Sequence, residues 1–403
     1  MPPAEPPPQA RQSTRFLLLY GLAAAGGAVS YVPFLTLLLP VRVDGMVGAA
    51  TIDLLAYIAF AGAIAASLAN IGFGWLSDRT RDRRGWIWAG LIASCALLVG
   101  VRATASPAQL IATIVAWQVA LNMMLSPLAA WAGDVVPDRQ KGMLGGLLAF
   151  APALGALAGA LVTWPGLAGP DMRLVLVAGL VAAMVLPVLV FGRPQAMPHL
   201  MADPPRTAEN QAAPPRRQAV VRMWLARLLV QIAEAALFAY LLVWFTRVDP
   251  GVTDSDTARI FSFVLVLSVP LALLAGRWSD RTDRPILPLT IGAGIGTLGL
   301  VGMALAPGLG SAIGGYILFG VASSVFLALH SSQTLRVLPR PATRGRDLGL
   351  FNLTNTVPSL IMPWLALALV PQFGFGGLFA CLAVFAALAT ALLATIPRSE
   401  IAA

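Results

Sequence analysis

Long apolar runs separated by short polar loops dominate this 403-residue chain. About 20 apolar residues in helical form cross the hydrocarbon core of a bilayer, so each run predicts a membrane-spanning helix. Backbone polar groups in lipid must bond within a helix or a closed barrel, and the runs lack the alternation of barrel strands. The predicted fold class is an all-α membrane protein with twelve transmembrane helices. The runs are residues 15–39, 50–76, 85–102, 107–133, 142–164, 171–192, 220–246, 254–277, 284–305, 309–335, 346–370 and 374–396.

A short motif occurs twice, each time at the end of an apolar run. The pattern G-x-x-S-D-R-T surrounds Asp78 and again Asp280, 202 residues further on. Pro137 and Pro339, which follow the fourth and tenth runs, are separated by the same 202 residues. Parallel repeats of this kind are typical of secondary transporters. We therefore predict two six-helix bundles related by a parallel repeat.

Polar, proline-rich segments divide the chain into parts. Residues 1–12 are expected to form a disordered tail, because they are rich in proline and poor in apolar residues. Residues 193–219 contain six prolines and are predicted to be a cytoplasmic linker. The N-terminal six-helix bundle is then residues 13–192, the C-terminal bundle residues 220–397, and residues 398–403 a short tail.

Basic residues concentrate on one side of the predicted membrane. With the N-terminus inside, 21 of the 27 Lys and Arg residues fall on the cytoplasmic side and five on the outer side, while Arg227 lies within a run. This is the asymmetry of the positive-inside rule, so both termini are expected in the cytoplasm and the membrane to be an inner or plasma membrane. The net charge of +9 is thereby explained without nucleic-acid binding, and the lipid bilayer is the expected partner.

Composition supports a membrane protein and gives no sign of an enzyme. The chain is 58% hydrophobic and 11% charged, and its mean hydropathy is +0.79. Cys95 and Cys381 both fall within runs, so we expect neither a disulfide nor a metal site. No phosphate-binding glycine loop is present in the sequence. The chain is expected to be a monomer without cofactors.

The loop motif, its repeat and the six-plus-six layout together resemble the major facilitator superfamily over essentially the whole ordered chain. Within it, SDRTRDRRG at 77–85 and DLGLFNLTNTVP at 347–358 resemble the glycoside/pentoside/hexuronide-cation symporter branch and its sucrose-transporter-like relatives. Cation-coupled carriers of that branch have acidic residues in helix 2 shortly before the loop, whereas residues 69–71 here are Ala-Asn-Ile. Sodium coupling through that position is therefore not expected.

The charged loop residues are candidates for a gate. A carboxylate at a membrane edge can pair with a guanidinium or cap a neighbouring helix, and thus latch the two bundles. The alternative is a solvated topology signal, and the resemblance favours the latch. The six expected gating residues are Asp78, Arg79, Arg83, Asp134, Asp280 and Arg281.

Ionisable residues inside a span are functional candidates because they are costly there. Arg227, Gln231 and Glu234 are spaced i, i+4, i+7 and share one helix face. Burial disfavours the charged carboxylate and allows proton exchange, so Glu234 is the expected proton-coupling residue. A fixed ion pair with Arg227 is the alternative. His330 is a second proton-coupling candidate, or else a bonded interhelical histidine.

Polar and aromatic residues in the spans are candidates for solute binding. The resemblance implies that helices 1, 4, 7 and 10 line a central cavity. The alternative is that the amides join helices to one another, as they often do in membranes. The expected substrate-binding residues are Tyr20, Tyr31, Trp117, Gln118, Asn122, Arg227, Gln231, Gln333, Asn352 and Asn355.

The sequence predicts a secondary active transporter that works by alternating access. Its expected partners are protons and a small-molecule solute, and the first expectation is proton-coupled uptake of a sugar or glycoside-like compound. One alternative is a proton-antiport exporter of amphipathic or drug-like compounds, which would tolerate a mostly apolar site. The other is a non-transporting membrane assembly factor on the same fold, because fold alone does not determine function.

Overall fold

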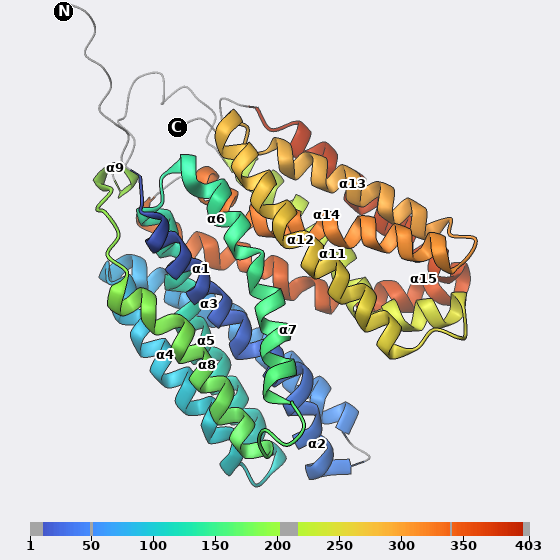
Figure 1. Cartoon of the computed structure of the whole chain (residues 1–403), viewed down its shortest axis with the longest axis horizontal. Helices are drawn as coiled ribbons and strands as arrows, with labels where there is room; N and C mark the ends of the chain where they lie inside the picture. The colour runs from blue at the N-terminus through green and yellow to red at the C-terminus, as the bar shows by residue number, and fades with distance from the viewer. Residues whose placement is uncertain (1–10, 49–50, 202–216, 339–340, 398–403) are drawn as a thin grey trace, which may run out of the picture.

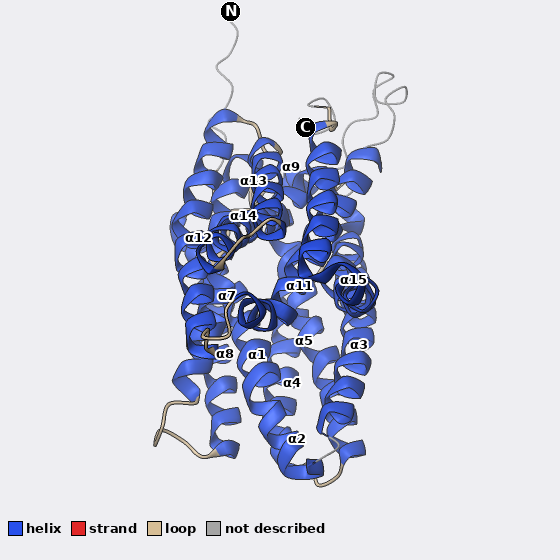
Figure 2. Cartoon of the chain, turned by 90° about the vertical axis from the view of Figure 1, so that its right-hand side faces the viewer, coloured by secondary structure: helices blue, strands red, loops and turns tan. Residues whose placement is uncertain are grey.

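The computed structural model describes residues 11–48, 51–201, 217–338 and 341–397, and all regular structure among them is helical (Figure 2). Most of the expected N-terminal tail, residues 202–216 of the expected linker and residues 398–403 lie outside the described residues. The described start of the linker contains a short helix, α9 (Pro198–Met201), and the next helix begins at Arg217 rather than at residue 220.

Helices of the first bundle follow the predicted runs closely. They are α1 (Thr14–Pro33), a five-residue π-helix (Phe34–Leu38), α2 (Leu39–Val47), α3 (Thr51–Thr80), α4 (Arg83–Gly100), α5 (Pro107–Val135), α6 (Lys141–Leu148), α7 (Phe150–Val162) and α8 (Pro170–Phe191). Side-chain caps begin several of them. The Asp82 carboxylate accepts the N–H of Gly85 at α4, and the Ser106 hydroxyl accepts the N–H of Gln109 at α5.

Helices of the second bundle are fewer and longer. They are α11 (Arg217–Val248), α12 (Asp254–Thr282), α13 (Leu287–Ala304), α14 (Leu309–Val337) and α15 (Arg344–Ala394). The 51-residue α15 covers two predicted runs, 346–370 and 374–396, and Gly374 breaks it with φ 66° and ψ −172°. This left-handed conformation suits glycine, so a kink rather than a polar loop separates the two runs.

Ten helices of the described chain are long and apolar enough to cross a membrane. The number rises to eleven when α11, bent by 58° between Leu237 and Tyr240, is counted as one span. The predicted all-helical membrane fold is therefore confirmed, whereas twelve separate helices are not. The first predicted run ended at residue 39, but its helical path continues to Val47.

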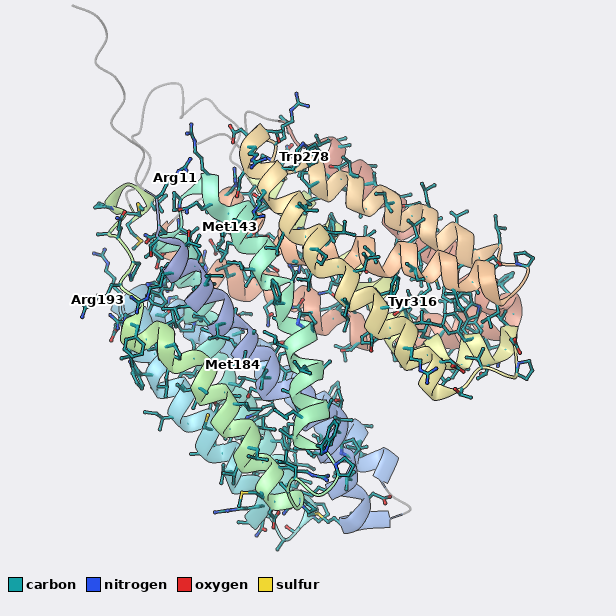
Figure 3. The ribbon with its side chains drawn as sticks, in the orientation of Figure 1. Arg11, Met143, Met184, Arg193, Trp278 and Tyr316 are labelled. Atoms are coloured by element: carbon teal, nitrogen blue, oxygen red, sulfur yellow. The ribbon has the colours of Figure 1, made fainter. Side chains whose placement is uncertain are left out.

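Each bundle has an apolar core of its own, and the bundles meet at one end. One core is built mainly from α1, α3, α4, α5 and α8 and also includes Leu335 of α14, while two others are built from α11 to α15. Figure 1 shows the bundles touching where α6 passes α12 and diverging toward the opposite end. Met143 of α6 and Trp278 of α12 mark this region in Figure 3. We call the end where α3 meets α15 and α6 meets α12 the closed end.

Glycines allow the helices to touch at the closed end. A Cβ on Gly74 of α3 would lie 2.2 Å from the carbonyl oxygen of Gly345 in α15. A Cβ on Gly276 of α12 would lie 2.0 Å from the carbonyl oxygen of Gly142 in α6. Gly74 and Gly276 are 202 residues apart, so the internal repeat produces two equivalent crossings. Close backbone approach through small residues is a common way to pack membrane helices.

One added methyl group at such a crossing should push its two helices apart. We expect Gly74→Ala to lower stability by about 1–3 kcal/mol, because the new Cβ meets backbone rather than a flexible side chain. The matched control is Gly179→Ala in α8, where no atom lies within 4 Å of the added Cβ and helix propensity favours alanine by up to about 1 kcal/mol. Thermal unfolding in detergent compares the two. Equal unfolding temperatures for both variants would contradict the close crossing.

Candidate functional site

The carboxylate of Asp78 caps a helix of the opposite bundle. Its two oxygens accept the backbone N–H groups of Gly345 and Arg346, both at 2.9 Å, in the first turn of α15. The first N–H groups of a helix have no partner within it and carry partial positive charge, which a carboxylate neutralises. Arg83 adds a charged bond, with its Nη2 2.6 Å from Asp78 Oδ1. Asp78 therefore joins α3, α4 and α15.

Asp280 makes the equivalent cap in the other direction. Its oxygens accept the N–H groups of Gly142 and Met143 at the start of α6, both at 2.8 Å. Arg336 of α14 donates to Asp280 Oδ1 at 3.1 Å. Each bundle thus supplies one carboxylate that caps one helix of the other. We call these two caps and their arginines the latch.

Asp134 links the bundles through two arginines. Its Oδ2 accepts Arg83 Nε at 2.9 Å within its own bundle, and its Oδ1 accepts Arg344 Nη1 at 2.6 Å from the start of α15. All three residues are less than a tenth exposed. The residue 202 positions after Asp134 is Arg336, so the repeat replaces an acid with a base at this place. The two halves of the latch therefore share geometry but differ in charge.

The structure places three of the six expected gating residues, Asp78, Arg83 and Asp280, in the latch, and Asp134 beside it through Arg83. Arg79 and Arg281 are exposed instead and make no bond within the described chain. Sequence reasoning missed Arg336, Arg344 and Lys141. Lys141 is buried and donates to Asp138 Oδ1 at 2.5 Å and to the Leu335 carbonyl at 3.2 Å. The 202-residue offset could have drawn attention to Arg336.

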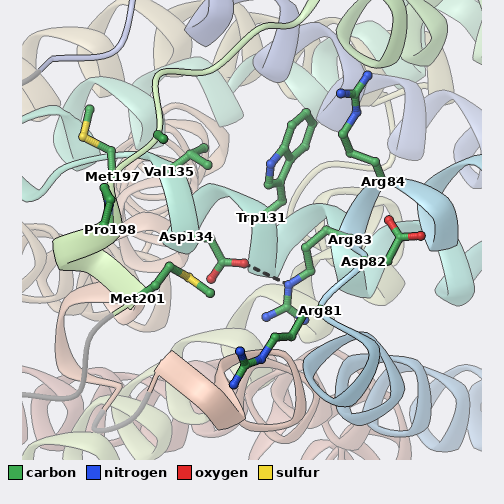
Figure 4. Close-up of a pocket in the computed structure, with 11 residues that line it drawn as sticks. Arg81, Asp82, Arg83, Arg84, Trp131, Asp134, Val135, Met197, Pro198 and Met201 are labelled. Carbon is green, nitrogen blue, oxygen red and sulfur yellow. Dashed lines mark hydrogen bonds and ion pairs between the residues drawn. The ribbon is translucent and has the colours of Figure 1, made fainter.

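A hollow of about 380 Å³ lies beside the latch. Arg81, Arg83 and Asp134 line it from one side, and Met197 and Met201 from the linker (Figure 4). The dashed line in Figure 4 marks the bond from Arg83 to Asp134. The start of the linker therefore covers the charged junction, and Arg344 also bonds the Leu200 carbonyl at 3.2 Å.

A second group of polar residues lies deeper, along α11. Arg227 Nη1 donates to Ser331 Oγ of α14 at 2.9 Å, and its Nη2 donates to Asn355 Oδ1 of α15 at 3.2 Å. Gln231 Nε2 donates to the same Asn355 oxygen at 2.6 Å. Asn355 Nδ2 in turn donates to Asn352 Oδ1 at 2.6 Å. We call these five residues, together with His330, the polar cluster.

His330 is held by bonds on both ring nitrogens. Its Nε2 lies 3.0 Å from the Met223 carbonyl, and its Nδ1 lies 3.4 Å from Arg227 Nη1 and 3.1 Å from Thr334 Oγ1. A guanidinium can only donate, so Nδ1 is the acceptor and the network assigns the ring proton to Nε2. In this arrangement the buried His330 is neutral and positions Arg227.

Glu234 lies two turns beyond Arg227 on the same face of α11. It makes no hydrogen bond or ion pair within the described residues, so it does not form a fixed salt bridge with Arg227. It lies on the face of α11 that also carries Arg227 and Gln231, whose side chains bond residues of α14 and α15.

Six expected binding residues lie outside the polar cluster; besides Tyr31 and Gln118, these are Tyr20, Trp117, Gln333 and Asn122, each of which bonds or packs within its own bundle. Tyr20 is 3% exposed and donates to the Leu128 carbonyl at 2.9 Å. Trp117 is fully buried in the same core, with its ring 4.9 Å from that of Phe34. Gln333 is buried near the latch, where its Nε2 lies 3.4 Å from Ser279 Oγ.

Asn122, the fourth of these residues, joins α3 to α5. Its Oδ1 accepts Asn70 Nδ2 at 2.8 Å, and its Nδ2 donates to the carbonyl of the neighbouring Gln118 at 2.9 Å. Ser126 Oγ donates to the Asn70 carbonyl at 2.8 Å. These amides join α3 to α5. The sequence did not indicate Asn70 as a partner of Asn122.

A membrane protein of two helical bundles, with a charged junction and a polar cluster within its spans, has the layout of a secondary transporter. The model of the Major Facilitator Superfamily matches residues 16–342 and 223–402, and the chain belongs to this family of transporters. No curated protein sequence matches the chain significantly.

Solved structures of the same fold cover nearly the whole chain. The E. coli fucose:proton symporter FucP, in the outward conformation, has a TM-score of 0.75 at 13% identity, with 94% of this chain and 98% of FucP covered. The human organic anion transporter MFSD10 (TETRAN) has a TM-score of 0.74 at 15% identity, covering 96% and 100%. A bacterial homologue of the iron transporter ferroportin, in an outward-facing state, has a TM-score of 0.72 at 17% identity, covering 94% and 98%.

Removing one cap should shift the chain toward a second state, in which the bundles are apart at the end that is closed here. Asp78→Asn loses charge-assisted bonds worth about 1.5–3 kcal/mol each, so we expect at least a roughly tenfold change in population. The reporter is a cysteine at Thr356, whose hydroxyl lies 3.0 Å from Ser67 across the bundles, labelled with a membrane-impermeant maleimide after Cys95 and Cys381 are replaced by alanine.

Arg79→Gln is the matched control for the Asp78 variant, because Arg79 is adjacent and exposed. It should label at the wild-type rate. If Asp78→Asn also labels at that rate, the cap does not hold the bundles together.

Proposed function

We propose that this chain is a proton-coupled secondary transporter that takes up a sugar or glycoside-like solute by alternating access. The observation that carries the proposal is Glu234. It is an acid within a span, on the same face of α11 as Arg227 and Gln231, and it has no bonded partner in the described residues. Such a group is free to gain and lose a proton as the bundles move.

The proposed orientation follows from charge and from the closed end. The basic loops next to the latch belong in the cytoplasm by the positive-inside rule. In this orientation the twelve predicted spans include the two halves of α15 as separate crossings, both termini are cytoplasmic, and the diverging end faces outward. The membrane is an inner or plasma membrane. The conformation is then ready to receive solute from outside.

In this proposal, the chain alternates between two states in which the latch is formed or broken. Opening toward the cytoplasm must pull Asp78 and Asp280 from the helix starts that they cap. Each released carboxylate keeps a bond to an arginine of its own bundle: Asp280 keeps Arg336, and Asp78 keeps Arg83, which it shares with Asp134. Two states of similar energy are what alternating access requires.

The proposed solute contacts are the amides of the polar cluster and Tyr31. Gln231, Asn352 and Asn355 present donors and acceptors suited to hydroxyl groups, and Asn355 is exposed. Tyr31 is 41% exposed and comes from the opposite bundle. FucP, a fucose:proton symporter of the same fold, supports the choice of a sugar and of protons.

Glu234→Gln should abolish proton-driven accumulation but leave solute exchange intact. Exchange of labelled for unlabelled solute requires binding and bundle movement without net proton transfer, whereas accumulation requires the titrating carboxylate. The assay uses proteoliposomes with an internal pH dye and a panel of sugars and glycosides. We expect substrate-driven acidification of the liposome interior only with wild-type protein.

Asp171→Asn controls for loss of one acidic charge, because Asp171 is exposed at the start of α8. It should behave as wild type. Accumulation by Glu234→Gln at the wild-type level would show that Glu234 is not the coupling residue. Solute movement without protons in the wild type would make the protein a uniporter.

A further inference from the structure

Opening of the closed end would leave the first bundle with one negative charge too many. Asp78 and Asp134 share Arg83 within that bundle, and all three side chains are less than a tenth exposed. Their remaining partners are the first N–H groups of α15 and the side chain of Arg344, which belong to the other bundle. Two carboxylates that share one guanidinium repel each other, so a further cation from the same bundle would stabilise the open state.

Arg81 is placed to supply this charge. It lines the hollow beside the latch together with Asp134 (Figure 4), and its side chain makes no hydrogen bond or ion pair with any described residue. Arg84 also lines the hollow, but its guanidinium donates to the Leu189 carbonyl. Arg79 does not line it. Among the arginines of the hollow, Arg81 is therefore the one whose guanidinium is free within the described part of the chain.

The backbone at Arg81 has a conformation that disfavours every residue except glycine. Arg81 has φ 55° and Asp283 has φ 50°, and no other non-glycine residue in the described ranges has a positive φ. The two are 202 residues apart, and each directly follows a helix whose last turn it closes through a bond to the carbonyl of Ser77 or Ser279. Glycine is the usual residue at such a helix end. Charged side chains at both copies of this position indicate that the side chains have a use.

The second half of the repeat shows the corresponding pair already formed. Arg336 Nη1 lies 3.7 Å from Asp283 Oδ1, within one bundle. Arg336 occupies the repeat position of Asp134, and Asp283 occupies that of Arg81. The same two types of side chain are thus present at the same two positions, with the acid and the base exchanged. Their combined length bridges the gap in the second half, so we expect it to suffice in the first.

Arg344 explains why the pair is absent from the first half in this conformation. It donates to Asp134 Oδ1 at 2.6 Å, while Arg83 donates to Oδ2 at 2.9 Å, so both carboxylate oxygens are occupied. The residue 202 positions before Arg344 is Gly142, so the other half of the junction has no counterpart of this arginine. Asp283 therefore meets no such competitor, whereas Arg81 is kept from Asp134 until the bundles separate.

We propose that Arg81 replaces Arg344 as the partner of Asp134 when the closed end opens. The inference rests on the alternating access of the proposed function and adds a gating residue to it. The hollow of about 380 Å³ is the space through which the Arg81 side chain moves. Two carboxylates then have two guanidiniums in both states, one of which changes from Arg344 to Arg81. Arg81 thereby stabilises the open state and determines how often the closed end opens.

The test measures how fast Thr356→Cys reacts with a membrane-impermeant maleimide, in vesicles whose cytoplasmic side faces outward and with Cys95 and Cys381 replaced by alanine. Arg81→Gln should slow labelling roughly three- to tenfold, because the open state loses an ion pair that the closed state does not contain. Arg81→Lys should keep most of the wild-type rate. Arg79→Gln, at an exposed arginine outside the hollow, should label as wild type.

Two further variants separate the proposed pair from other effects of the substitution. In a chain that already carries Asp134→Asn, Arg81→Gln should cause no additional change, because its partner carboxylate is gone. Arg81→Gly removes the charge and also relieves the left-handed backbone. It should slow labelling as Arg81→Gln does, yet unfold at a higher temperature than Arg81→Gln in detergent.

The contrary results are distinct for the exchange and for alternating access. A wild-type labelling rate in Arg81→Gln, or equal slowing with and without the Asp134 carboxylate, would overturn the exchange and leave alternating access standing. Faster labelling of Arg81→Gln would also overturn it, because Arg81 would then hold the closed end together. If the wild-type reporter never labels from the cytoplasmic side, alternation at this junction is wrong, and the exchange with it.

Discussion

Two carboxylates that cap helices of the opposite bundle hold the structure together at its closed end. Asp78 satisfies the first N–H groups of α15, and Asp280 satisfies those of α6. A helix start that lost its cap in a low-dielectric junction would leave partial positive charge unpaired. The caps also require close backbones, which the glycine crossings provide. Helix dipole, glycine packing and ion pairs therefore act at one place.

The largely separate cores explain how such a junction can be broken without unfolding. Most buried apolar residues pack within their own bundle, Leu335 of α14 being an exception in the first core, and the junction is rich in charged residues and glycines. Asp134 differs from the two capping carboxylates, because its partner in the other bundle is a side chain. It pairs with Arg83 in its own bundle and with Arg344 in the other. When the bundles part, Asp134 keeps its bond to Arg83, which it shares with Asp78. This shared partner lowers the cost of several kcal/mol that a wholly uncompensated buried charge would carry.

The repeat allowed much of the junction to be predicted. The 202-residue spacing indicated that Asp78 and Asp280 play matching parts, and apolar length indicated the helices. What they cap could not be read from the chain, since the partners are backbone N–H groups more than 130 residues away. The sequence also could not show that α15 continues through a glycine kink, because both halves are equally apolar.

The residues of the proposed solute site were harder to predict for a physical reason. In a span that is apolar on all sides, periodicity does not distinguish a face toward the core from a face toward the other bundle. Tyr20 and Trp117 share helices with plausible site residues but pack into the first core. Arg227, Gln231 and Glu234 were recognisable because charge is costly in lipid and their spacing places them on one face.

Alternating access requires the closed end to open while solute moves. The most direct measurement is the distance between spin labels at positions 79 and 281, whose exposed arginines lie in different bundles and outside the latch. With Cys95 and Cys381 replaced, one short distance is expected for the empty protein at neutral pH. Adding transported solute at lower pH should produce a second, longer distance. A single unchanged distance during active transport would contradict alternation at this junction.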